Sequence, residues 1–369
     1  MKYYIIAGEA SGDLHGSHLI KELQLLDNHA DFRCWGGDKM EETGAVLVKH
    51  YRELAFMGFA EVLMNLRTIL RNLVTCKTDI LLHKPDVLIL IDYPGFNLRI
   101  AKWAKRKGLK VIYYISPQVW AWKENRVKKM KECIDKMLVI LPFEKSYFKD
   151  KWNWEVEYVG HPLLQVVGSY ESGVGSQKLS DKPIVALMPG SRKQEIQKKL
   201  PVMLEVSRSF SDYQFIVAKA PGVEEGFYND MLSSYSNVSY VANQTYDLLM
   251  QSKAALVTSG TATLETALFG VPEVVCYKGS WLSYQIGKRL VYVKYISLVN
   301  LIMDKLVVKE LIQNDLTADN LKKELEDLLT NNSRIEQLGK DFTALKHLLS
   351  AGGNASAKAA AAIIKLLSQ

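Results

Sequence analysis

The chain has little of what marks secreted, zinc-binding or membrane-spanning proteins. Its four cysteines are scattered singly among 369 residues, so no close pair is available for a redox motif or a zinc site. No uninterrupted apolar run approaches the roughly 20 residues that cross a bilayer, and the first apolar segment begins too early for a signal peptide. These absences predict a cytoplasmic protein whose contact with a membrane is at most peripheral.

Two nucleotide- and metal-binding motifs are also missing. No clean G-x-G-x-x-G sequence follows an apolar run, which argues against a dinucleotide cofactor, and no D-x-D pair is present to hold a metal ion on a diphosphate. His15 and His18 stand three residues apart but lack a third ligand at matching spacing. We therefore expect neither a cofactor nor a metal ion.

Positive charge is gathered into two stretches, although the net charge of +7 is modest for this length. The first covers residues 102–110 without an acidic residue, and the second covers residues 123–131. Such a stretch binds nucleic acid, anionic lipid or a phosphorylated substrate, or it is simply a solvated helix face. The residue pattern alone leaves these interpretations open.

Apolar runs that predict buried strands alternate with segments of helical period, which is typical of parallel sheets covered on both faces. With 48% hydrophobic residues, the chain can bury two cores, and a Gly- and Ser-rich stretch at residues 168–183 is interpreted as the linker between two α/β domains. An alanine-rich tail, residues 354–367, predicts a final helix. The predicted strands are Tyr3–Ala7, Val87–Ile91, Val111–Ile115, Met137–Leu141, Ile184–Met188, Phe215–Ala218, Ala254–Thr258 and Glu273–Tyr277.

Two strand-to-helix turns in the second half predict an anion site. Pro189–Ile196 follows one apolar run and Ser259–Glu265 follows another, and each opens a helical pattern. Backbone N–H groups and the positive end of a helix dipole favour a phosphate or diphosphate there, and the Arg192 guanidinium can fork onto its oxygens. Glu265 either accepts hydrogen bonds from ribose hydroxyls or stabilises the helix end, and Ser191 has the spacing of a capping-box residue.

In the first half, the glycine-rich turn over residues 8–16 carries polar groups at the expected edge of the sheet. Its glycines allow close backbone approach, while Glu9, Asp13 and His15 can face a substrate; the alternative is a tight turn with Asp13 as a helix cap. Asp92 ends the next strand-like run, where it is either a general base with a raised pKa or the cap of the following helix.

Three further segments have both a structural and a functional interpretation. Gln118 and Trp120, within Ser116–Arg126, form either a rigid rim for an acceptor or the cover of a core edge. Residues 54–76 carry apolar side chains at helical spacing, which indicates either core packing or an interfacial helix whose arginines meet anionic headgroups. Asn300 lies in a predicted loop and can line the site.

Eight motifs together resemble those of the lipid-A-disaccharide synthase family. They occur in the family's order, and the resemblance extends from residue 8 to about residue 313. The motifs are GEASGD (8–13), IDYPGFN (91–97), SPQVWAW (116–122), LPFE (141–144), GHP (160–162), PGSRKQEI (189–196), SGTATLE (259–265) and SLVN (297–300).

The resemblance implies an α/β protein of the GT-B fold, in which two Rossmann-like domains with parallel sheets face a central cleft and a C-terminal helix crosses back to the first domain. Residues 1–167, with about 345–369, would form the acceptor- and membrane-facing domain, and residues 168–344 the UDP-sugar domain. The implied reaction is an inverting, metal-independent transfer from UDP-2,3-diacylglucosamine to 2,3-diacylglucosamine 1-phosphate (lipid X). Its products are a β-1,6-linked lipid A disaccharide 1-phosphate and UDP.

By position in these motifs, the resemblance assigns Asp92 as the catalytic base, and Arg192 and Asn300 as further residues needed for activity. It places UDP binding on Gly190, Ser191, Arg192, Glu195, Ser259, Gly260, Thr261, Ala262, Thr263 and Glu265. The expected acceptor-side residues are Glu9, Ser11, Asp13, His15, Gln118 and Trp120. The expected membrane-facing residues are Phe59, Leu63, Leu66, Ile69 and Leu70.

The expected partners are the two lipid substrates, an anionic membrane surface at the inner face of a Gram-negative inner membrane and, as one option, a second copy of the chain. Nucleic acid is not expected. One alternative is another UDP-sugar enzyme of the GT-B fold, such as a UDP-N-acetylglucosamine 2-epimerase or the peptidoglycan transferase, which would lack SPQVWAW. The other is a non-catalytic nucleotide-sugar-binding membrane adaptor, against which the retention of Asp92 with Arg192 argues.

Overall fold

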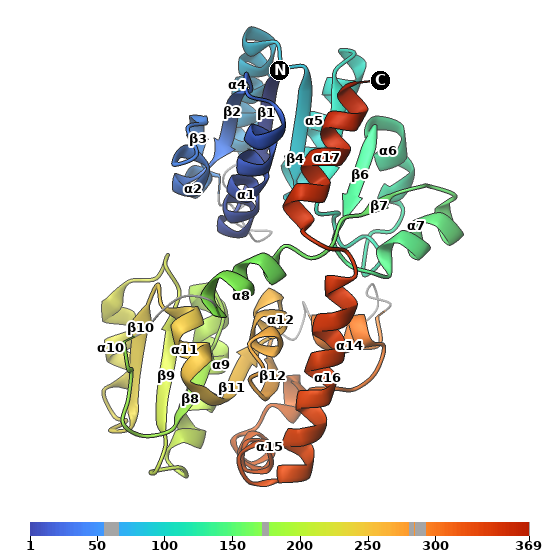
Figure 1. Cartoon of the computed structure of the whole chain (residues 1–369). Coiled ribbons are helices and arrows are strands. Elements are labelled where there is room, and N and C mark those ends of the chain that lie inside the picture. The colour runs from blue at the N-terminus through green and yellow to red at the C-terminus, as the bar shows by residue number, and fades with distance from the viewer. Residues whose placement is uncertain (55–65, 172–176, 280–283, 285–292, 369) are drawn as a thin grey trace. The chain divides into compact units, whose positions relative to one another are not determined.

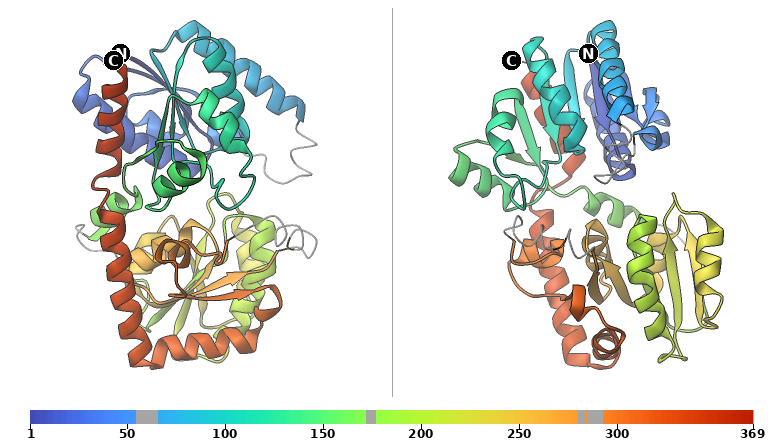
Figure 2. Two further views of the ribbon diagram at one scale, coloured as in Figure 1. Left: turned by 90° about the vertical axis from the view of Figure 1, so that its right-hand side faces the viewer. Right: turned by 180° about the vertical axis from the view of Figure 1, so that it is seen from behind.

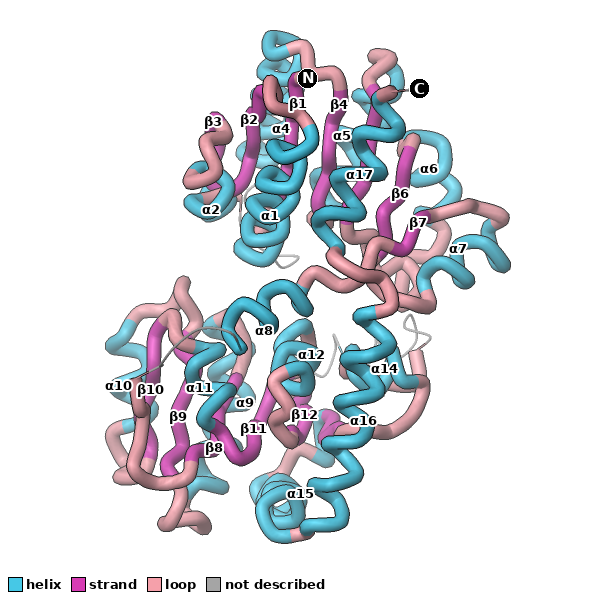
Figure 3. The backbone as a smooth tube through the Cα atoms, in the orientation of Figure 1, coloured by secondary structure: helices cyan, strands magenta, loops and turns pink. Residues whose placement is uncertain are grey.

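The chain folds as two compact units of alternating strands and helices (Figures 1 and 3). This computed structural model describes residues 1–54, 66–171, 177–279, 284 and 293–368. Unit 1 comprises Met1–Pro162 and Leu349–Gln369, and unit 2 comprises Leu163–Leu348.

Unit 1 is built on a seven-stranded parallel sheet in the order β3-β2-β1-β4-β5-β6-β7. Its strands are β1 (Lys2–Ala7), β2 (Asp31–Gly36), β3 (Val46–His50), β4 (Val87–Ile91), β5 (Lys110–Tyr114), β6 (Lys136–Val139) and β7 (Glu157–Tyr158). Its helices are α1 (Ala10–Leu26), α2 (Asp38–Glu41), η1 (Tyr51–Glu53), α4 (Leu66–His83), α5 (Pro94–Arg106), α6 (Arg126–Cys133), α7 (Glu144–Trp152) and α17 (Ala355–Leu367). The strand order reverses between β1 and β4, the kind of switch point at which ligands bind in open α/β sheets.

Both faces of this sheet are covered, as the fully buried strand β4 requires. Figures 1 and 2 show α1 and α17 on one face and α4 and α5 on the other. The C-terminal helix α17 packs Ala359 and Ile363 into the core formed with Leu19 and Leu23 of α1. The predicted tail helix and its return to the first domain are therefore confirmed.

Unit 2 is built on a six-stranded parallel sheet in the order β10-β9-β8-β11-β12-β13. Its strands are β8 (Ile184–Met188), β9 (Gln214–Lys219), β10 (Val238–Ala242), β11 (Ser252–Thr258), β12 (Glu273–Tyr277) and β13 (Lys309–Ile312). Its helices are α8 (Leu163–Glu171), α9 (Lys193–Ser207), α10 (Glu225–Leu232), α11 (Thr245–Gln251), α12 (Thr261–Leu268), α14 (Leu298–Met303), η2 (Gln313–Asp315), α15 (Ala318–Thr330) and α16 (Asn332–Ser350), of which the last two residues belong to unit 1. Ile184 and Ala186 pack into a core with α11, while the alternate residues Val185 and Leu187 are buried too, so both faces of this sheet are covered.

All eight predicted strands are confirmed, with ends that differ by at most two residues. The prediction misses β2, β3, β7, β10 and β13, because polar or charged residues such as Asp31 and Arg33 interrupt their apolar pattern. The interpretation of residues 168–183 as a linker is wrong for its first residues, which belong to a helix. Gly168 lies inside helix α8, where its neighbours Val166 and Val167 are buried.

Candidate functional site

A cavity of about 420 Å³ lies in unit 2, where the carboxyl ends of β8 and β11 meet. The parallel register pairs Met188 with Val257, so the two turns that follow these strands lie side by side. Nine of the ten residues predicted to bind UDP line the cavity: Gly190, Ser191, Arg192, Glu195, Ser259, Gly260, Thr261, Ala262 and Glu265. The tenth, Thr263, is buried, and its hydroxyl donates to the Gly260 carbonyl oxygen at 2.8 Å.

The helices α9 and α12 both begin at this cavity. Arg192 is the N-cap of α9 and Gly260 the N-cap of α12. An arginine side chain has no acceptor and glycine has no side chain, so neither N-cap residue accepts a side-chain hydrogen bond from the first turn of its helix. The positive ends of two helix dipoles therefore point toward a shared space, which favours an anion. The capping-box interpretation of Ser191 is wrong, because α9 begins one residue later than that motif requires.

The charges beside the cavity are arranged around Glu195. The Arg192 guanidinium lies 3.3 Å from one carboxylate oxygen and the Lys199 ammonium 4.0 Å from the other. Lys199 is buried, which lowers its pKa, whereas the Arg192 side chain is exposed. Gly190, with a φ of +120°, passes so close that a Cβ atom there would lie 2.7 Å from Glu195 Oε2. Arg192 can turn from Glu195 to an incoming anion, while Lys199 stays with the carboxylate.

Glu265 is the second carboxylate of the cavity. Burial raises its pKa from 4.5 to about 7, while the Tyr246 hydroxyl, 3.5 Å from Glu265 Oε1, opposes the rise. A carboxylate in this setting gains from the hydrogen-bond donors of a ligand, such as the two hydroxyls of a ribose. The sequence did not indicate that Ala218–Pro221 and Thr245 also line the cavity. The signal for the first of these was available, because the predicted strand Phe215–Ala218 ends there.

In unit 1, the equivalent edge of the sheet carries Asp92. The register pairs Ala7 with Ile91, so the turn after β1 lies against the turn after β4. The approach is close at Gly8, where a Cβ atom would lie 2.3 Å from the Tyr93 ring. Glycine at this position is what allows the two turns to meet.

Asp92 is held in an unusual backbone conformation. Its φ is +42° and that of Tyr93 is +46°, which is the left-handed region that residues with a side chain rarely occupy. The Asn97 side-chain amide donates a hydrogen bond of 2.9 Å to the Asp92 carbonyl oxygen, and the Tyr113 hydroxyl donates a second one to the same oxygen. The surrounding structure therefore fixes Asp92 in place at the cost of local strain.

The pKa of Asp92 is raised, and its side chain does not cap helix α5. Burial, and after it the charge of Glu9, raises the pKa of Asp92 from 3.8 to about 7. Helix α5 begins at Pro94 with Tyr93 as its N-cap, and no side chain caps it. The interpretation of Asp92 as a helix cap is therefore wrong.

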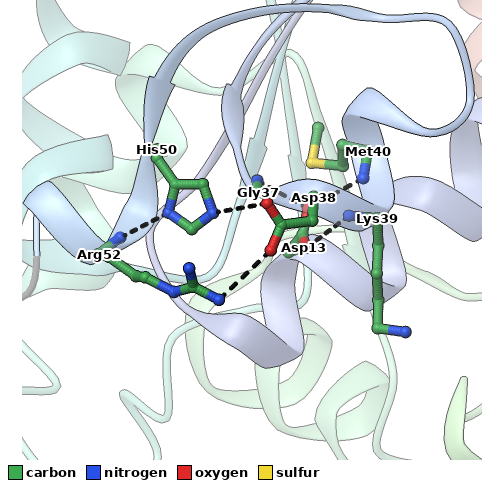
Figure 4. A network of polar contacts seen from close by, with 7 residues as sticks. All are labelled: Asp13, Gly37, Asp38, Lys39, Met40, His50 and Arg52. Atoms are coloured by element: carbon green, nitrogen blue, oxygen red, sulfur yellow. Dashed lines mark hydrogen bonds and ion pairs between the residues drawn. The ribbon is translucent and has the colours of Figure 1, made fainter. Parts of the chain in front are cut away.

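The other acceptor-side residues divide into surface and structural groups. Glu9 is the partly exposed N-cap of α1 and Ser11 is exposed. The buried Asp13 carboxylate accepts hydrogen bonds from the N–H groups of Gly37, Lys39 and Met40 and so caps α2 instead of α1 (Figure 4). Burial, with a smaller effect of His18, lowers the pKa of His15 to about 4. Asp13 therefore has a structural role, and His15 is neutral at pH 7.

Gln118 is exposed, whereas Trp120 anchors the loop between β5 and α6. The Trp120 indole donates a hydrogen bond of 3.2 Å to Glu144, and its ring packs edge-on against Phe143 at 5.0 Å. Glu144 is buried, which raises its pKa to about 7, and it also accepts from the N–H groups of Ile140 and Leu141. The LPFE motif thus supplies an anchoring carboxylate that the residue pattern did not single out.

Asn300 is buried inside helix α14, so the prediction of a loop at this position is wrong. Its amide donates to the Val308 carbonyl oxygen and to Glu310, and its carbonyl oxygen accepts from the N–H groups of Val307 and Val308. Asn300 fixes the segment that leads into β13. Its side chain does not line the cavity described above.

The predicted membrane-facing residues lie on or before helix α4. Phe59 and Leu63 are outside the described residues, and Leu66 is described only as the first residue of the helix. Ile69 is partly buried and Leu70 is 52% exposed. None of the helices in the described part of the chain is long and apolar enough to cross a membrane.

The described residues contain no group of three or more His, Cys, Asp or Glu side chains arranged to hold a metal ion. The cysteines Cys34, Cys76, Cys133 and Cys276 are all free and buried.

Both the family match and the relatives described next point to one enzyme. The family described as lipid-A-disaccharide synthetase matches residues 3–364. Lipid-A-disaccharide synthase of Geobacter sulfurreducens is 39% identical, with 98% of this chain and 96% of the relative covered. Lipid-A-disaccharide synthase 1 of Legionella pneumophila is 34% identical, with 94% and 92% covered.

Solved structures share the fold at much lower identity. The glycotransferase of kitacinnamycin superposes with a TM-score of 0.68 at 15% identity, with 99% of this chain and 98% of that chain covered. UDP-GlcNAc 2-epimerase from Neisseria meningitidis bound to UDP-GlcNAc gives a TM-score of 0.68 at 13% identity, with both chains covered in full. The epimerase likeness therefore concerns the fold alone, whereas the synthases match in sequence over nearly the whole chain. The chain belongs to the lipid-A-disaccharide synthetase family and is a GT-B glycosyltransferase of lipid A biosynthesis.

Proposed function

We propose that unit 2 holds the UDP moiety of UDP-2,3-diacylglucosamine and that unit 1 binds and activates the acceptor, 2,3-diacylglucosamine 1-phosphate. The observation that carries this assignment is the cavity of unit 2, on which two helix N-termini, Arg192 and Glu265 converge. Each matches one part of a nucleoside diphosphate. The helix ends and Arg192 suit the diphosphate, and Glu265 suits the ribose hydroxyls.

Asp92 is the proposed base of the transfer. In an inverting reaction the acceptor hydroxyl attacks the anomeric carbon, a new C–O bond forms, and UDP leaves with the electron pair of the broken bond. The proton of the hydroxyl passes to Asp92. Its pKa of about 7 keeps the carboxylate basic enough to accept that proton and still largely ionised at slightly alkaline pH.

The departing UDP gains negative charge as its bond to the sugar breaks. We assign the stabilisation of this charge to the N–H groups at the starts of α9 and α12 and to Arg192, which take the place of a metal ion. Because these groups are fixed before the reaction, they stabilise the transition state without reorganisation. The proposed transfer is therefore metal-independent.

Helix α4 supports the proposed contact with a membrane at the inner face of the inner membrane. Leu73, Cys76 and Ile80 bury one face of this helix in unit 1. Leu70 and Val74, one turn apart on another face, are 52% and 64% exposed. Exposed apolar side chains next to the arginine-bearing start of α4 fit an interfacial helix, and the acylated substrates enter the reaction from such a surface.

The test is a reconstitution with purified protein and both lipid substrates in neutral detergent, with and without EDTA. We expect equal amounts of the disaccharide 1-phosphate and UDP, formed at the same rate in both cases. Folded, UDP-binding protein that forms no disaccharide would overturn the assigned reaction. Product formation that EDTA abolishes would overturn only the metal-independent mechanism.

A further inference from the structure

Two positive side chains share one exposed aromatic ring in the loop between β5 and α6 of unit 1. The Lys123 ammonium lies 4.0 Å from the centre of the Trp122 ring, and the Arg126 guanidinium carbon lies 5.8 Å from it. Trp122 itself is 44% exposed. Both cations are thus presented to solvent on a flat apolar platform.

The loop between β5 and α6, which carries Trp122 and Lys123, is fixed to unit 1 by buried side chains. Trp120 is hydrogen-bonded to the buried Glu144, and Val119 is buried. Glu124, the one acidic residue between Ser116 and Asn125, is engaged elsewhere. It lies 2.7 Å from the Lys151 ammonium and accepts a hydrogen bond of 2.7 Å from the Tyr147 hydroxyl. The Glu124 carboxylate is therefore paired with Lys151 and Tyr147, and not with the cations beside the Trp122 ring.

In the part of the chain that the structure describes, neither cation is paired with a carboxylate. Among the described residues, no acidic oxygen comes within 4.0 Å of Lys123 or Arg126, and the first turn of α6 carries no acidic residue. Burial, and after it the charge of Arg126, lowers the pKa of Lys123, so the two positive charges oppose each other. An arrangement in which like charges are held together gains stability when an anion binds between them.

This platform lies on the same edge of the sheet as Asp92. The register pairs Ile91 at the end of β4 with Tyr114 at the end of β5, so the segments after these two strands are neighbours. Tyr113 connects them, because its hydroxyl donates to the Asp92 carbonyl oxygen. Burial raises the pKa of Tyr113 well above its usual value, and the charges of Asp92 and Arg126 act on it in opposite directions. Both charged groups are therefore near this hydroxyl.

We propose that Lys123 and Arg126, supported by the Trp122 ring, bind the 1-phosphate group of the acceptor. This inference rests on the proposed function, in which unit 2 takes the diphosphate of the donor and leaves the acceptor's phosphomonoester without a partner. A phosphomonoester carries nearly two negative charges at neutral pH and accepts the bidentate hydrogen bonds that a guanidinium offers. Binding there holds the acceptor by a group that takes no part in the transfer and leaves its 6-hydroxyl free for the base.

The experiment compares two acceptors, 2,3-diacylglucosamine 1-phosphate and the same molecule without the phosphate, by calorimetric titration in neutral detergent. Three forms of the protein are compared: wild type, the double variant Lys123→Met with Arg126→Met, and the control Lys128→Met. Lys128 lies in helix α6, which also carries Arg126. We expect the double variant to bind the phosphorylated acceptor about 10- to 100-fold more weakly. Its affinity for the unphosphorylated acceptor should equal that of wild type, and Lys128→Met should change neither affinity.

Equal losses for both acceptors would overturn the proposal, because the cations would then act on the loop and not on the phosphate. Unchanged affinities in detergent, with binding lost only on vesicles of anionic phospholipid, would also overturn it and assign the cations to lipid headgroups. The titration needs no turnover, so it is decided even if Asp92 is not the base. Unchanged UDP affinity in the double variant separates this site from the cavity of unit 2.

Discussion

The buried side-chain amide of Asn97 donates a hydrogen bond of 2.9 Å to the carbonyl oxygen of Asp92 and thereby holds the proposed base in a left-handed backbone conformation. The same amide donates to the Ile91 carbonyl oxygen at 3.2 Å. Its removal takes one donor from each of these two carbonyl oxygens, leaves the Tyr113 hydroxyl as the remaining side-chain donor to Asp92, and lets the strained turn relax.

We therefore predict that Asn97→Ala lowers kcat by roughly 100-fold, because a small displacement of a catalytic group has a large effect on rate. The free energy of unfolding should fall by about 1–3 kcal/mol. UDP affinity, measured by titration, should stay at the wild-type value, since the cavity lies in the other unit. Unchanged kcat in the folded variant would show that the turn does not position the base.

The pH dependence of turnover tests the ionisation of Asp92. Its pKa is raised to about 7, and the base acts only when ionised, so kcat/KM for the acceptor should be low in acid and rise through pH 7 to a plateau. Glu9 contributes to the raised pKa, so Glu9→Gln should move the midpoint of this rise to lower pH. Saturating donor keeps the titration of Glu265 out of the profile. A midpoint that does not move in Glu9→Gln would contradict the proposed interaction.

Lys199 offers a test of the electrostatics at the UDP cavity. Its buried ammonium lies 4.0 Å from Glu195, whose charge would otherwise repel a diphosphate. We expect Lys199→Met to weaken UDP binding about tenfold, which corresponds to about 1.4 kcal/mol. Adding Glu195→Gln should restore part of that loss, because the repelling charge is gone. A double variant that binds UDP no better than Lys199→Met would show that Lys199 acts by packing alone.

The exposed face of α4 is the part of unit 1 that we expect to contact a membrane. Replacing Leu70 and Val74 by Ser should reduce co-sedimentation with anionic vesicles and leave the melting temperature unchanged, because both side chains are exposed. The matched control is Leu73→Ser on the buried face, which should lower the melting temperature clearly. Loss of stability without loss of vesicle binding in the Leu70 and Val74 variant would assign this face to packing.

The sequence pattern predicted eight of the strands and the two turns that line the cavity of unit 2, because both depend on local features. A continuous apolar run such as Val87–Ile91 has few alternatives to a buried parallel strand, and a glycine turn before a helical pattern fixes where the helix starts. The register of β8 and β11 then brings the two turns to one cavity.

The contacts that failed to be predicted depend on long-range geometry. Asp13 caps a helix that begins 25 residues later, and Trp120 binds Glu144 across 24 residues. Asparagine is common in loops, yet the Asn300 side chain is buried and donates a hydrogen bond to the Val308 carbonyl oxygen in the segment before β13. Residue identity alone does not distinguish a polar side chain that binds a substrate from one that satisfies buried backbone groups.

The most direct test of the account is the Asp92→Asn variant, which keeps the shape of the side chain and removes its basicity. Single-turnover formation of the disaccharide should be compared with UDP affinity in the same preparation. We predict a rate reduced by at least about 100-fold, with UDP affinity and melting temperature close to wild type. Turnover at the wild-type rate would contradict the assignment of Asp92 as the base.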